Sequence, residues 1–128
     1  LHTFYRPENY QMLGESEFEL MEKGVIIINT ARGELIDQDA LIRAVKSGKV
    51  AGVGMDVVEG EPIGSDHPLL ALDNVVIVPH IATYTIESLK RMGDKVVEDV
   101  EKVSQGQIPE GVVNPEVLQK ENRAGLRL

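Results

Sequence analysis

The chain has 128 residues, of which 42% are hydrophobic and none is cysteine, so one domain with a real core is expected and disulfide bonds are excluded. Its 21 acidic and 13 basic side chains give a net charge of -8, which would repel nucleic acids and anionic membranes and disfavours both as partners. No apolar run approaches the roughly 20 residues that cross a bilayer, and the amino end lacks a secretory pattern, so we expect a soluble, cytoplasmic protein.

The first half of the chain predicts a helix, a strand and a second helix. Ser16 and Glu19 have the spacing of a capping box for a short helix, and Gly24 is suited to end it. Residues 25–28 are too few and too apolar for a surface helix. They predict a strand buried on both faces, as in a parallel sheet. Asp37 is expected to cap the second helix.

Two more strands are predicted, at residues 50–56 and 75–78, with at most one helical turn at residues 69–72 between them. Gly52 and Gly54 within the earlier strand predict close approach of a ligand or of a neighbouring strand. Strands and helices therefore alternate along the chain. This order predicts an α/β fold with a parallel sheet.

A long amphipathic helix is predicted to begin near Thr85 and to end by Gly106, because apolar residues recur at steps of three and four. Gly93 within it costs about 1 kcal/mol relative to alanine, so we interpret it as the mark of a tight contact. Residues 107–128 are polar, contain two prolines and show little periodicity. They predict an extended tail.

Charged side chains follow the predicted strands. Arg32 comes soon after the first strand, Asp56 ends the second and His80 follows the third, while Glu61 lies in the turn-like stretch 58–62. Ligands of open α/β sheets bind outside the carboxyl ends of the strands. We therefore expect these four side chains to meet around one small anionic substrate.

These residue types can together reduce a 2-oxo acid. The planar guanidinium of Arg32 can hold a carboxylate through two parallel hydrogen bonds and so orient the carbonyl group. His80 can donate a proton during reduction and accept one during oxidation, because an imidazole changes charge near neutral pH. Glu61 can bind the other ring nitrogen, which fixes the tautomer and favours the imidazolium.

Two assignments stay open on chemical grounds. Glu59 and Glu61 share one acidic turn, so either carboxylate could be the partner of His80. Asp56 could cap the loop that follows it or face the nicotinamide of a cofactor.

Three motifs occur in a fixed order: residues 30–33 (Thr-Ala-Arg-Gly), 56–62 (Asp-Val-Val-Glu-Gly-Glu-Pro) and 79–82 (Pro-His-Ile-Ala). Together with residues 1–9 and 113–115, they resemble the signatures of the D-isomer-specific 2-hydroxyacid dehydrogenases. One such motif alone would be weak, but three at compatible spacing are specific. The resemblance implies a Rossmann-type doubly wound parallel sheet, NAD as cofactor, a small D-2-hydroxy or 2-oxo acid as substrate, and a homodimer.

The resemblance also implies roles for individual residues. The catalytic residues would be Arg32, Glu61 and His80, with Glu61 identified as the glutamate just before Pro62. The cofactor contacts would be Thr30, Ala31, Arg32 and Asp56 near the nicotinamide, and Thr3, Phe4 and Asn9 beside the adenosine and pyrophosphate. The family usually has a proline shortly after the Leu-His pair, and this chain departs from that pattern at residues 3–5.

The Gly-x-Gly-x-x-Gly loop that opens a dinucleotide-binding unit is absent from these 128 residues. The simplest interpretation is that residues 1–106 are the carboxyl-terminal part of the dinucleotide-binding domain, and that residues 107–128 return to a substrate domain outside this chain. Two alternatives stay open, namely an NAD(H)-sensing, corepressor-like binding protein and a non-catalytic fragment. No metal ligand set is predicted, because the three histidines lie in unrelated contexts and cysteine is absent.

Overall fold

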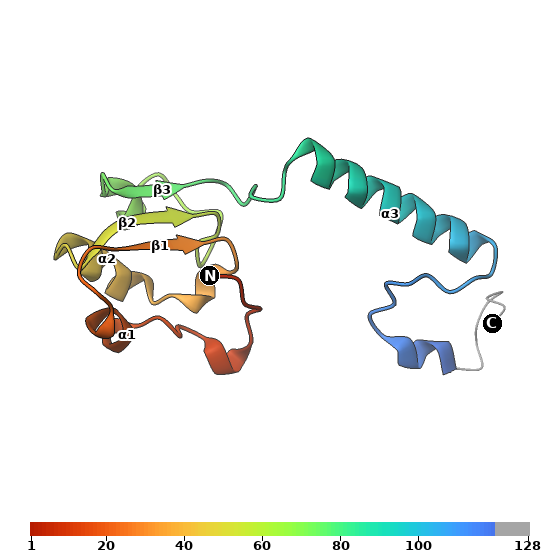
Figure 1. Ribbon diagram of the computed structural model, residues 1–128, viewed down its shortest axis with the longest axis horizontal. Coiled ribbons are helices and arrows are strands. Elements are labelled where there is room, and N and C mark those ends of the chain that lie inside the picture. The colour runs from red at the N-terminus through yellow and green to blue at the C-terminus, as the bar shows by residue number, and fades with distance from the viewer. Residues whose placement is uncertain (120–128) are drawn as a thin grey trace. The chain divides into compact units, whose positions relative to one another are not determined.

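The computed structural model describes residues 1–119, which form two compact units, Leu1–Ala82 and a second that begins at Thr83 (Figure 1). The first unit contains a sheet of β1 (Val25–Asn29), β2 (Val50–Met55) and β3 (Val75–Ile77), in that order. Both strand pairs are parallel, which confirms the predicted α/β class. Since the strands run the same way, their carboxyl ends lie at one edge of the sheet.

Two helices of the first unit are α1 (Glu15–Leu20) and α2 (Gln38–Lys46). The predicted cap of α2 is confirmed, because the backbone nitrogen of Ala40 donates to Oδ1 of Asp37 at 3.0 Å. The capping box predicted for Ser16 is wrong by two positions. The backbone nitrogen of Gly14 donates to Oε2 of Glu17 at 3.0 Å, so the helix starts earlier and its first turn is closed by a different glutamate.

Short 3-10 helices complete the first unit: η1 (Pro7–Asn9), η2 (Gly33–Leu35) and η3 (Pro68–Ala71). The last of these is the single turn predicted before the third strand.

The core of the first unit lies on one face of the sheet. Side chains of Ile27, Val53 and Met55 are buried there with Leu41 and Val45 of α2. Among the described residues, the prediction that the first strand is buried on both faces is met on one face only, since Ile26 and Ile28 are 66% and 53% exposed. The reason is the pleat, because successive side chains alternate between faces and α2 covers only one of them.

The neighbouring strand explains the glycine at position 54. A Cβ atom there would lie 2.9 Å from Cδ1 of Ile28, which is its partner residue in the parallel register. The glycine therefore leaves room for an isoleucine side chain on the adjacent strand, one of the two predicted reasons for it.

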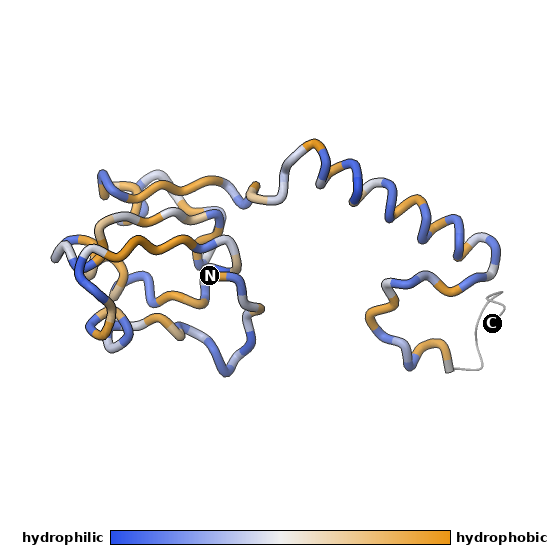
Figure 2. Tube along the Cα trace, viewed as in Figure 1, coloured by the Kyte–Doolittle hydropathy of each residue, from blue (hydrophilic) through white to orange (hydrophobic). Residues whose placement is uncertain are grey.

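The second unit contains α3 (Ile86–Ser104), whose cap is Thr85, with Oγ1 accepting from the backbone nitrogen of Ser88 at 3.1 Å. Its bounds and its alternation of polar and apolar residues confirm the predicted amphipathic helix (Figure 2). The contact predicted at Gly93 is not found within this unit, because, apart from the adjoining residues and the helix's own backbone, no described atom lies within 4 Å of the position of an added Cβ. A 3-10 helix, η4 (Pro115–Gln119), follows, and the rest of the predicted tail lies outside the described residues.

Among residues 1–119, no helix is both long and apolar enough to cross a membrane. The same residues contain no cluster of three or more His, Cys, Asp or Glu side chains suited to a metal ion.

Candidate active site at the carboxyl edge of the sheet

The turn after β1 is built by a buried amide. Asn29 is fully buried, its Nδ2 donates to the carbonyl oxygen of Arg32 at 2.8 Å, and its Oδ1 accepts from the backbone nitrogen of Ala31 at 3.0 Å. These two bonds close residues 29–32 into a fixed turn. Sequence reasoning gave Asn29 no role, although a polar residue at the end of an apolar strand was the available signal.

The turn presents the guanidinium of Arg32 to solvent. Its Nη1 donates to the carbonyl oxygen of Ala31 at 2.6 Å, and it forms no ion pair with any side chain of residues 1–119. The remaining N–H donors are therefore available to an anionic ligand. Five donors in a planar fork can bind a carboxylate in bidentate fashion.

The segment after Arg32 packs directly on residues 58–62, which we call the acidic turn. Gly33 is buried, and a Cβ added to it would lie 2.1 Å from the backbone nitrogen of Glu59 and 2.2 Å from the carbonyl carbon of Val58. Only a glycine allows the two backbones to come this close. The position of the acidic turn is thus fixed relative to Arg32.

Within that turn, Glu61 is the glutamate that contacts His80. Its Oε1 lies 2.6 Å from Nδ1 of His80, and its Oε2 accepts from the backbone nitrogen of Val58 at 3.2 Å. Glu59 is engaged elsewhere, because its Oε1 accepts from the hydroxyl of Tyr10 at 2.9 Å. That hydrogen bond raises the pKa of Tyr10 above its ordinary value of 10.0.

His80 is held in an unusual backbone conformation. Its φ of 55° lies in the left-handed region, which few residues other than glycine adopt, and such strain clusters at functional sites. The side chains of His80 and Glu61 are half exposed, at 50% and 40%. With Nδ1 directed to the carboxylate, Nε2 is the ring nitrogen left for a ligand.

Asp56 lies under this segment. Its side chain is buried and its Oδ1 accepts from the backbone nitrogens of Ile81 at 2.6 Å and Ala82 at 3.0 Å. The geometry therefore shows the loop contact that the sequence offered as one of two possibilities. The proposed contact with a nicotinamide stays a prediction.

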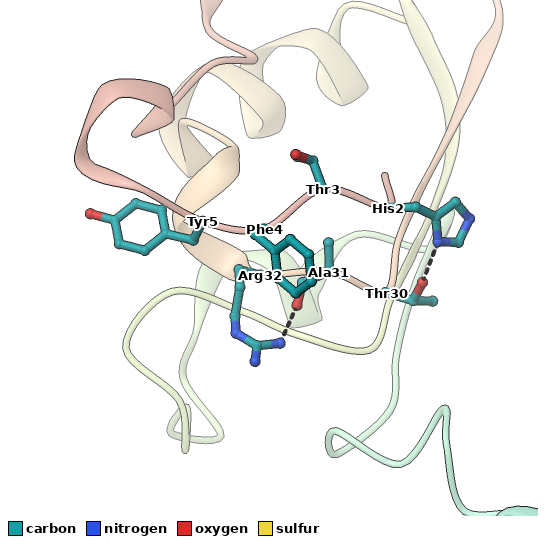
Figure 3. A pocket seen from close by; sticks show the side chains of 7 residues that line it. All are labelled: His2, Thr3, Phe4, Tyr5, Thr30, Ala31 and Arg32. Atoms are coloured by element: carbon teal, nitrogen blue, oxygen red, sulfur yellow. Dashed lines mark hydrogen bonds between the residues drawn. The ribbon is translucent and has the colours of Figure 1, made fainter. Parts of the chain in front are cut away.

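A cavity of about 410 Å³ opens beside the turn of residues 29–32 (Figure 3). The side chains that line it come from residues 2–5 and from the end of β1: His2, Thr3, Phe4, Tyr5, Thr30, Ala31 and Arg32. It brings together five of the residues predicted to contact the cofactor. The two residues that sequence reasoning missed are His2, whose Nδ1 lies 3.4 Å from Oγ1 of Thr30, and Tyr5.

Two predicted cofactor residues do not line this cavity. Asn9 shapes the preceding loop, since its Nδ2 donates to the carbonyl oxygen of Phe4 at 2.8 Å and its Oδ1 accepts from the backbone nitrogen of Arg6 at 2.7 Å. Asp56 lies under the loop that follows β3. His80 and Glu61 border a separate depression of about 290 Å³, formed with Pro62 and Pro79.

Comparisons with known proteins agree with these features. Residues 1–82 match the family described as "D-isomer specific 2-hydroxyacid dehydrogenase, NAD binding domain". The chain is 44% identical over 118 residues to a glyoxylate reductase of Korarchaeum cryptofilum, covering 92% of this chain and 36% of that protein. It is 42% identical over 114 residues to a D-3-phosphoglycerate dehydrogenase of Archaeoglobus fulgidus, covering 89% and 22%.

Among solved structures, the chain is similar to a D-lactate dehydrogenase of Aquifex aeolicus complexed with NAD and lactic acid. The TM-score is 0.73 at 40% identity, with 83% of this chain and 36% of that chain covered. The chain thus spans about a third of the length of the glyoxylate reductases that it matches.

Proposed function

This chain belongs to the D-isomer-specific 2-hydroxyacid dehydrogenase family, and from that premise we propose that it carries the catalytic edge of an NAD-dependent oxidoreductase for small D-2-hydroxy and 2-oxo acids. Residues 1–82 are part of the NAD-binding domain of this family, whose cofactor is NAD. The observation that carries the proposal is the 2.6 Å contact between Nδ1 of His80 and Oε1 of Glu61, at the sheet edge that also presents Arg32.

Arg32 is proposed to bind the substrate carboxylate. Its guanidinium is exposed and forms no ion pair with the described side chains, so an incoming carboxylate meets a cation with free donors. A bidentate pair fixes the substrate in position and in orientation, which brings the 2-oxo group into a defined geometry.

His80 is proposed to move the proton. Its Nε2–H can donate to the carbonyl oxygen as negative charge develops there, and in the reverse reaction Nε2 can accept the hydroxyl proton. The Glu61 carboxylate accepts from Nδ1–H, which keeps the ring oriented and leaves Nε2 facing the substrate in this proposal. Since Val58 donates its backbone N–H to the same carboxylate, the glutamate is itself fixed.

The cavity beside Arg32 is proposed to receive part of the dinucleotide. Its volume of about 410 Å³ is within the usual range of small-molecule sites, and the rings of Phe4 and Tyr5 with the hydroxyls of Thr3 and Thr30 suit a flat polar ring. When bound, the cofactor would supply a hydride to C2 of the 2-oxo acid in its reduced form, NADH, and would accept one from the hydroxy acid in its oxidised form, NAD⁺. By the resemblance, Thr30, Ala31, Arg32 and Asp56 would hold the nicotinamide end, and Thr3, Phe4 and Asn9 the rest.

The proposal extends to the whole protein. The relatives named above are enzymes, which favours a catalytic role over that of an NAD(H)-sensing binding protein. We propose glyoxylate, hydroxypyruvate or another small 2-oxo acid as substrate, a homodimer as the working form and the cytoplasm as its location. Sedimentation of the purified protein would test the dimer directly.

Steady-state kinetics of the whole purified protein test the reaction. The consumption of NADH is measured over a panel of 2-oxo acids. For H80Q we expect kcat to fall by about 100-fold to 10,000-fold, the range for loss of a general acid and base. For R32K we expect KM to rise about tenfold or more, because a lysine cannot form the bidentate pair. H67Q is the matched control, since His67 caps η3 through a hydrogen bond from the backbone nitrogen of Leu69 and lines neither cavity.

An active wild-type protein with unaffected H67Q and impaired H80Q and R32K would support the proposal. Full activity of H80Q would refute the assignment of the proton donor. No consumption of NADH by the wild-type protein with any acid of the panel would refute the catalytic proposal.

A further inference from the structure

Asp56 makes contacts to both neighbouring strand ends of the candidate site. Its backbone nitrogen donates to the carbonyl oxygen of Asn29 at 2.9 Å, and its own carbonyl oxygen accepts from the backbone nitrogen of His80 at 2.9 Å. Its Oδ1 accepts from Ile81 and Ala82. One residue thus connects the end of β1 with three consecutive residues that follow β3.

The burial of Asp56 makes its side-chain contacts strong. Only 5% of the residue is exposed, and a carboxylate removed from water is costly unless its oxygens accept hydrogen bonds. The two N–H groups at 2.6 and 3.0 Å supply them. Bonds from backbone N–H to an ionised oxygen are roughly twice as strong as neutral ones.

These contacts act on the one strained residue of the catalytic pair. The left-handed φ of 55° at His80 must be held by its surroundings. Each of the three successive backbone nitrogens of residues 80–82 donates to an oxygen of Asp56, and that of His80 also donates to the carbonyl oxygen of Val78 at 3.0 Å. The imidazole is attached to this backbone, so its 2.6 Å contact with Glu61 depends on the same conformation.

We infer that Asp56 is a positioning residue, which holds the backbone of residues 80–82 so that the His80 ring meets Glu61. The inference rests on the proposed function for the meaning of that pair, but the contact itself can be measured without turnover. This positioning role of Asp56 is separate from any contact that the residue makes with the cofactor. Oδ1 is the atom that performs it, because it accepts the backbone N–H groups of Ile81 and Ala82.

The experiment compares D56A and D56N in the purified protein by NMR. A histidine Nδ1 that donates to a carboxylate gives a ring ¹⁵N signal distinct from that of a free imidazole, and H80Q identifies the His80 signal by its loss. An asparagine can still accept both N–H groups through its amide oxygen, whereas an alanine cannot. We therefore expect the signal to disappear in D56A and to persist in D56N.

D37A is the matched control, because Asp37 also accepts a backbone N–H, from Ala40, but caps α2. We expect the His80 signal to persist in D37A. In activity assays, D56A should lose about 100-fold in kcat, as expected for displacement of a catalytic group by about 1 Å, with little change in KM.

A second measurement needs no variant. The side chains of Ile81 and Ala82 are exposed, so slow hydrogen exchange of their backbone amides would come from the bonds to Asp56. Fast exchange of both amides would overturn the inference, even if D56A failed to fold. Persistence of the signal in folded D56A, or its loss in D56N, would also overturn it.

The NMR result stands apart from the proposed function. A wild-type protein that shows the signal, loses it in D56A and yet reduces no 2-oxo acid would support the positioning role while refuting the enzymatic proposal.

Discussion

Substitution of Gly33 by alanine tests whether Arg32 and the acidic turn depend on one close backbone contact. The added Cβ would lie 2.1 Å from the backbone nitrogen of Glu59 and 2.8 Å from its Cα. Ordinary van der Waals contact begins at 3.4 Å. Both atoms belong to the backbone, so no side chain can rotate away, and the turn itself must move.

The expected cost follows from that displacement. Insertion of a methyl group into a packed contact typically destabilises a protein by about 1–3 kcal/mol, and a clash with backbone belongs at the upper end of this range. The acidic turn carries Glu61, so the same movement alters its contact with His80. Displacement of a catalytic group by about 1 Å can lower kcat about 100-fold.

The assay combines unfolding in urea with NADH-dependent reduction of the preferred 2-oxo acid. G52A is the control, because the nearest atom to a Cβ at Gly52 is the carbonyl oxygen of Asn74 at 3.8 Å, an ordinary contact. We expect G33A to lose both stability and kcat, and G52A to keep kcat. Equal kcat values for G33A and the wild-type protein would refute the argument that this contact positions the acidic turn.

Three further predictions concern local interactions. N29A leaves two backbone groups of the turn after β1 without partners and should lower the free energy of unfolding by about 1–3 kcal/mol in urea titration; an unchanged midpoint would contradict the role of the amide. D37A removes the cap of α2 and should cost about 1 kcal/mol by the same measurement, whereas D37N should cost less. The hydrogen bond from Lys102 lowers the pKa of Glu98, and the charge of Lys102 lowers the pKa of Glu110. Both carboxylates therefore stabilise the second unit at pH values above their ordinary pKa of 4.5. That stabilisation should be lost as the pH falls through the lowered values, and circular dichroism should show a smaller acid-induced loss of helix in K102Q than in the wild-type protein.

Sequence patterns predicted the elements of this chain because those patterns are local. The alternation of short apolar runs with amphipathic segments predicted three strands and the helix α3, and the structure has them within one or two residues. Asp37 could be identified as a cap, since a capping side chain bonds to a backbone nitrogen three residues away. The sequence also predicted which charged residues lie at strand ends, namely Arg32, Asp56 and His80, because each follows an apolar run within a few positions.

Tertiary structure decided which of these residues touch. Glu59 and Glu61 are equivalent in sequence, and only the path of the acidic turn directs one to Tyr10 and the other to His80. Which face of β1 is covered by α2 is also a tertiary property that an apolar run cannot reveal, and among the described residues Ile26 lies on the other face. Asp56 reaches Ile81 across 25 positions of chain, through the parallel register of β2 and β3. Periodicity and capping are properties of neighbouring residues, whereas contacts of this kind depend on how distant strands align, and that alignment is fixed only when the core packs.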